Sequence, residues 1–72
     1  MVKIQIYMQD NNVWEYEVDS FPKAREHAKR IITEGYINSE EDSLVFYPVH
    51  RIFKVKIIKH PKGKYVAEIY NL

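Results

Sequence analysis

The positively charged side chains of this chain are concentrated in one stretch, residues 48–64. It contains six Lys or Arg residues and two His but no Asp or Glu, whereas the whole chain of 72 residues has a formal net charge of only +1. A local excess of charge attracts anions in a way that a small net charge does not. The chemistry that this pattern predicts is the binding of a phosphate or a carboxylate.

Arg51 is the strongest candidate anion ligand, because a guanidinium can donate two parallel hydrogen bonds to a phosphate or carboxylate. His50 and Tyr47 nearby would add a donor and a stacking surface, and Pro48 stiffens the chain just before Arg51. The same segment also fits a structural corner, and lysines on edge strands also prevent aggregation. The remaining members of the predicted site lie on the following strands and their turn: Lys54, Lys56, Lys62, Lys64 and Tyr70.

Patterns typical of catalysis or metal binding are absent from the sequence. Without Cys the chain has no disulfide or zinc thiolate, which suits a reducing compartment such as the cytoplasm. Gly35 and Gly63 are too far apart for a phosphate-binding loop, and the three His lack zinc-ligand spacing. His27 is expected to be a partly buried core residue, and residues 38–43 a hydrated acidic loop. We therefore expect no enzymatic activity, no cofactor and no metal.

Alternation of apolar and polar residues predicts five strands. Residues 2–18 form a predicted hairpin whose turn contains Asp10–Asn12, residue types that favour turns. Three further strands are predicted over residues 44–47, 52–59 and 65–70.

One helix is predicted from Phe21 to about Glu34. Asp19 or Ser20 can accept hydrogen bonds from its first amides, and Pro22 is tolerated in the first turn. Gly35 is a typical residue for the helix end. Apolar residues recur at steps of three and four and form the stripe expected to face the core: Phe21, Ala24, Ala28, Ile31 and Ile32.

The turn between the last two strands sets their register. The predicted turn has three residues, 61–63, with Gly63 in the left-handed conformation. A two-residue turn is disfavoured because it would place a carboxylate on the apolar face. In the favoured register Lys54, Lys56 and Tyr70 point outward together. The side chains that point inward are Phe53, Val55, Ile57, Ala67 and Ile69.

These elements predict a single α+β domain over residues 1–72, with the order β-β-α-β-β-β and one helix on one face of a mostly antiparallel sheet. So short a chain buries only about 60% of its unfolded surface, and a symmetric dimer would add burial. No run approaches the roughly 20 apolar residues of a membrane helix, and we expect no signal peptide. The predicted core contains Ile4, Ile6, Trp14, Ala28, Ile31, Phe53, Val55, Ile57 and Ile69.

A short chain that opens directly into a hairpin, together with the segment Tyr47-Pro48-Val49-His50-Arg51-Ile52, resembles small uncharacterised proteins of bacteriophages and prophages. The resemblance implies a compact binding protein that acts on a host protein or a nucleotide signal. It carries no site residues over to this chain.

Two functions remain open at this point. The first is a non-enzymatic protein-interaction or self-associating module, favoured because acidic residues gather in the first hairpin and the middle loop while basic residues gather near the end. The second is an anionic-ligand binder that holds a nucleotide or nucleic acid on the basic hairpin of residues 50–64, where cations alternate with aromatic and apolar side chains.

Overall fold

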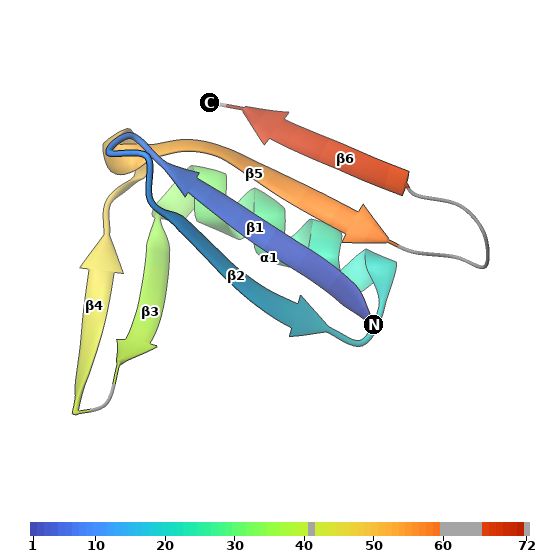
Figure 1. Ribbon diagram of the computed structural model, residues 1–72, viewed down its shortest axis with the longest axis horizontal. Helices are drawn as coiled ribbons and strands as arrows, with labels where there is room; N and C mark the ends of the chain where they lie inside the picture. Colours follow the sequence, from blue (N-terminus) through green and yellow to red (C-terminus); the bar gives the residue numbers. More distant parts are fainter. Residues whose placement is uncertain (41, 60–65, 72) are drawn as a thin grey trace.

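The computed structural model describes residues 1–40, 42–59 and 66–71. Within these ranges it contains one α-helix, one short 3₁₀ helix and six strands, which confirms the predicted α+β class (Figure 1). In chain order the elements are β1 (Val2–Met8), β2 (Val13–Val18), α1 (Phe21–Glu34), β3 (Tyr36–Glu40), β4 (Ser43–Tyr47), the 3₁₀ helix η1 (Val49–Arg51), β5 (Ile52–Lys59) and β6 (Val66–Asn71).

The main layer is a four-stranded antiparallel sheet with the strand order β2-β1-β5-β6, and α1 lies across one of its faces (Figure 1). No element of the described part of the chain covers the other face, which we call the uncovered face. Strands β3 and β4 form a separate antiparallel pair that projects away from the sheet. The sequence-based prediction missed β3, because residues 38–40 had been assigned to an acidic loop.

Local residue types explain the first turn and the helix start. Asn11 has a φ of 74°, a conformation that Asn tolerates, and the Asp10 carboxylate accepts a hydrogen bond from the Asn12 amide at 3.1 Å. Ser20 caps α1 because its hydroxyl accepts from the Lys23 amide at 3.4 Å. The predicted hairpin and the predicted helix bounds are therefore confirmed.

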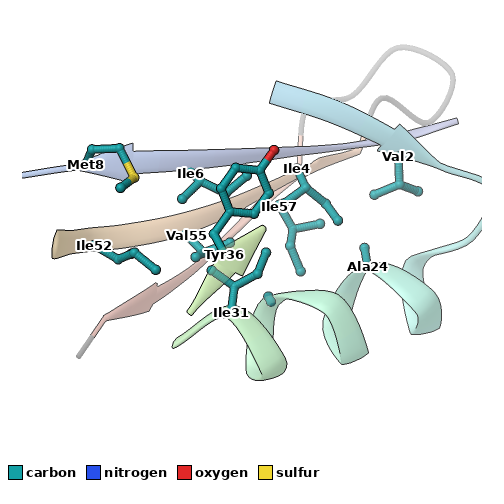
Figure 2. Packing of buried hydrophobic residues seen from close by; sticks show 11 residues of the cluster. Val2, Ile4, Ile6, Met8, Ala24, Ile31, Tyr36, Ile52, Val55 and Ile57 are labelled. Carbon is teal, nitrogen blue, oxygen red and sulfur yellow. The ribbon is translucent and has the colours of Figure 1, made fainter. Parts of the chain in front are cut away.

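The core lies between α1 and the sheet. Ala24 and Ile31 of the helix point toward the side chains of β1 and β5 (Figure 2). Trp14 is only partly buried and packs against this cluster. The predicted core positions that are confirmed as buried are Ile4, Ile6, Ala28, Ile31, Val55 and Ile57.

The predicted register between β5 and β6 is wrong by one residue. Val55 lies opposite Tyr70 rather than Ile69, which is 51% exposed on the uncovered face. The new register turns Glu68 toward the helix side of the sheet. There Arg25 donates from Nε and Nη2 to its two carboxylate oxygens, at 3.1 and 3.0 Å. A carboxylate on this face is therefore paired, which the sequence pattern could not reveal.

Phe53 was also predicted to point inward and is instead 54% exposed. The pairing of β1 with β5 shifts here, because Tyr7 lies opposite Lys54 and Met8 lies opposite Ile52. Phe53 is the additional residue of this β-bulge, so strict alternation fails at this point. The bulge places Ile52 in the core, where it is fully buried.

Replacing Ile57 with Ala should lower the free energy of unfolding by about 2–5 kcal/mol, because the buried side chain would leave a cavity. Ile69→Ala removes the same atoms from a half-exposed position and should cost less than about 1 kcal/mol. Urea unfolding followed by circular dichroism measures both changes. Equal losses would contradict the observed register and favour the one predicted from the sequence.

Candidate functional site

The described residues of the predicted anion site do not all lie on one surface of the structure. Lys54 and Lys56 lie on the uncovered face, opposite Tyr7 and Gln5 of β1. Tyr70, predicted to point outward with them, lies on the helix side and packs against the core. This separation follows from the corrected register. Lys62, Lys64 and the predicted turn that contains them lie outside the described residues.

His50 and Arg51 are exposed on η1, which connects the β3–β4 hairpin to β5. The backbone amide of Arg51 donates to the Pro48 carbonyl at 2.9 Å, and its carbonyl accepts from the Gln9 amide at 2.8 Å. These backbone hydrogen bonds hold η1 as a structural corner. The sequence offered this as the alternative to an anion site. The Arg51 guanidinium forms no ion pair with a described residue, so its role in binding an anion stays a prediction.

Tyr47 belongs to a different group of side chains, which we call the aromatic row: Trp14, Tyr47, Tyr36 and Tyr16, in spatial order. Successive ring centroids lie 6.0, 6.2 and 6.2 Å apart. The last two pairs are stacked, with angles of 18° and 10° between ring planes. Since these rings come from β2, β3 and β4, the aromatic row joins the projecting hairpin to the edge of the main sheet.

Tyr16 ends the aromatic row against the helix. Its hydroxyl and Nδ1 of His27 are 2.8 Å apart and share a hydrogen bond, so His27 is the partly buried and satisfied histidine that was predicted. Burial raises the pKa of Tyr16 to about 12, the neighbouring Tyr36 contributes to the rise, and the positive charge of Arg30 opposes it. Burial and the neighbouring Tyr47 likewise raise the pKa of Tyr36.

Gly35 allows the chain to pass from α1 directly into β3. Its amide donates to the Ile31 carbonyl at 2.9 Å, and its φ of 104° lies in a region that favours glycine. A Cβ at this position would lie 2.6 Å from the Tyr47 carbonyl oxygen and 3.0 Å from the Phe46 ring. The predicted role of Gly35 at the helix end is confirmed, and the hairpin also packs closely against it.

The outward face of the β3–β4 hairpin exposes large apolar side chains. Ile37 lies opposite Phe46 and Ser39 lies opposite Leu44, so these four residues share one face, which we call the hairpin face. Ile37 is 61% exposed, Leu44 74% and Phe46 58%. The sequence-based prediction missed this surface because it treated the first of the two strands as a loop. The signal that could have found it is the alternation of inward Tyr36 with outward Ile37.

The uncovered face combines cations with aromatic rings. Nζ of Lys54 lies 4.8 Å from the ring centroid of Tyr7 and 5.6 Å from that of Phe53. Lys56 forms no ion pair with a described residue. Two acids of β2 partly balance this charge, because Glu15 and Glu17 lie opposite Gln5 and Lys3 on the same face. Oε2 of Glu15 lies 3.5 Å from Nζ of Lys3.

The raised pKa of Tyr16 predicts that folding stability falls as pH rises from about 10 to about 12. In the unfolded chain Tyr16 ionises near pH 10, whereas the folded state keeps its proton to about pH 12. The contribution of the protonated Tyr16 to the free energy of unfolding is thus complete below about pH 10 and is lost between about pH 10 and pH 12. Urea unfolding at several pH values between about 10 and 12 should show that the free energy of unfolding falls less with pH in Tyr16→Phe than in the wild type. Parallel falls would contradict the burial of this hydroxyl.

Comparisons with protein-family models, curated proteins and solved structures yield no match to this chain. The resemblance to bacteriophage proteins therefore stays a prediction. Within the described residues no helix is both long and apolar enough to cross a membrane. The same ranges contain no group of three or more His, Asp or Glu side chains placed to hold a metal ion.

Proposed function

We propose that this protein is a non-enzymatic interaction module that self-associates through the hairpin face, most simply as a symmetric dimer. The observation that carries this proposal is the exposure of Ile37, Leu44 and Phe46, each more than half accessible, on one face of one hairpin. Contiguous exposed apolar side chains on a small protein are typical of interaction sites.

The position of the hairpin favours a second copy as the partner. It projects beyond the sheet, so another copy can reach its outward face without displacing α1 (Figure 1). In a two-fold symmetric dimer each subunit contributes the same apolar patch, so these side chains become buried on both subunits. A chain of 72 residues has a small core of its own, and this extra burial would stabilise it.

The hairpin face is also held in place before any partner binds. The aromatic row fixes the inward side of the hairpin, and Gly35 fits closely against Tyr47 and Phe46. A preorganised surface loses less conformational entropy on association, which favours affinity. The same face would suit a different protein, including the host factor that the bacteriophage resemblance implies. A reducing compartment such as the cytoplasm suits a chain without Cys.

A second candidate function is the binding of a nucleotide or single-stranded nucleic acid on the uncovered face. The specific observation in its favour is the placement of Lys54 against the rings of Tyr7 and Phe53. Aromatic rings that stack on bases, next to cations that hold phosphates, are typical of such sites. Glu15 and Glu17 on the neighbouring edge strand weaken the positive field. For this reason we rank this function second.

Sedimentation equilibrium should give twice the mass of the 8.7 kDa chain at high micromolar concentration. Phe46→Gln should shift the protein to monomer, because it places an amide in the apolar interface. Phe53→Gln is the matched control, since it makes the same change at a similarly exposed ring on the uncovered face. It should leave the dimer intact.

Leu44→Gln gives an independent test, because Leu44 is the most exposed apolar residue of the hairpin face and contributes little to the fold. It should dissociate the dimer, and at concentrations low enough for the wild type to be monomeric its unfolding transition should match that of the wild type. A wild-type monomer at every concentration would contradict the proposed function. If Phe53→Gln dissociates the dimer and Leu44→Gln does not, the interface lies on the uncovered face, which would contradict self-association through the hairpin face.

The second candidate predicts that a short single-stranded oligonucleotide binds at low salt. Affinity should then fall with added salt by about one log–log unit for each phosphate neutralised. Phe53→Gln should weaken binding through lost stacking, whereas Phe46→Gln should not. Arg51→Ala tests whether the guanidinium that the sequence favours as the anion ligand contributes to this affinity. Fluorescence anisotropy with a labelled oligonucleotide measures these affinities, and no binding at low salt would eliminate this function.

A further inference from the structure

A pocket of about 400 Å³ opens between α1, β2 and β3. Ile31 and Ile37 supply aliphatic wall, and the stacked rings of Tyr16 and Tyr36 supply aromatic wall. Pockets that bind small molecules typically span about 300–1,000 Å³ and are lined mainly by such side chains. The size and lining therefore suit a compact ligand with an apolar body.

The polar part of the lining includes one cation, Arg30. Arg30 is the lining side chain with a permanent charge, and the pocket contains no carboxylate among its described lining residues. Glu26, one helical turn earlier, forms no ion pair with Arg30 within the described residues. The charge of Arg30 acts inside the pocket, because it lowers the pKa of Tyr16 against the larger effect of burial. Arg30 is exposed and has no ion pair among the described residues, so its guanidinium can pair with an anion that enters the pocket.

Other polar groups of the pocket are already oriented. The Tyr16 hydroxyl shares its hydrogen bond of 2.8 Å with His27, and the Tyr36 hydroxyl donates to Oδ1 of Asn38 at 3.4 Å. The wall is thus set by contacts within the protein, and a ligand would not need to rearrange it.

We propose that this pocket binds a small monocarboxylate with an apolar body. The carboxylate accepts two hydrogen bonds from the Arg30 guanidinium, and the apolar part packs against Ile31, Ile37 and the ring of Tyr36. One permanent positive charge balances one carboxylate, whereas it would leave part of the charge of a phosphate monoester without a cationic partner. This site goes beyond the proposed self-association: the pocket and the hairpin face share Ile37 and Ser39, whereas Leu44 and Phe46 of the hairpin face lie outside the pocket lining.

The test titrates phenylacetate, phenylpropionate and hexanoate into the ¹⁵N-labelled protein while amide chemical shifts are recorded. At least one of these acids should cause saturable shift changes centred on Arg30, Ile31 and Ile37. The corresponding neutral amide should bind about tenfold more weakly or worse, because it cannot form the charge-assisted pair. Acids that cause no saturable change at these residues would overturn the proposal.

Arg30→Gln should weaken binding of the same acid by about tenfold or more. Lys29→Gln is the matched control, since it removes one positive charge from the adjacent exposed helix position outside the pocket lining. It should bind like the wild type. Equal affinity in Arg30→Gln and Lys29→Gln would overturn the proposal. Sedimentation of Arg30→Gln should still show the wild-type mass, so the failure of this site and the failure of self-association remain distinguishable.

Discussion

The surfaces proposed here depend on the aromatic row that joins the β3–β4 hairpin to the main sheet. A two-stranded hairpin is at best marginally stable alone, so its position has to be set by side-chain contacts. Successive ring centroids from Trp14 to Tyr16 lie 6.0 to 6.2 Å apart. Trp14 Nε1 is buried without a hydrogen-bond partner among the described residues, so ring packing rather than hydrogen bonding holds this end. Once Tyr36 points inward, alternation along β3 turns Ile37 outward.

A single helix can cover only one face of the four-stranded sheet, and the two remaining surfaces differ in chemistry. The uncovered face carries Lys54 and Lys56 beside scattered exposed apolar residues, as expected for a sheet face that contacts water. The hairpin face is smaller and carries three large apolar side chains close together. The uncovered face therefore combines positive charge with exposed apolar residues, whereas the exposed side chains of the hairpin face are mainly apolar. Apolar exposure on a projecting hairpin is the feature that a folded monomer alone does not explain.

Periodicity predicted the parts of the fold that depend on neighbouring residues. The first hairpin, the bounds of α1 and the buried positions Val55 and Ile57 all follow from alternation or helical spacing. Interactions between distant segments decided the rest. In the observed register of β6 Glu68 meets Arg25, which lies 43 residues away, and the bulge at Phe53 appears in the pairing of β5 with β1. The acidic composition of residues 38–43 concealed β3 and with it the hairpin face and one wall of the pocket.

The most direct test of self-association through the hairpin face is a dilution series followed by amide chemical shifts. Dilution changes only the fraction of protein that is associated, so the residues whose shifts move identify the interface without any substitution. Self-association through the hairpin face predicts concentration-dependent shifts at Ile37, Ser39, Leu44 and Phe46, with Lys54 and Lys56 unaffected. Shifts that move mainly on the uncovered face, or that stay constant at every concentration, would contradict it.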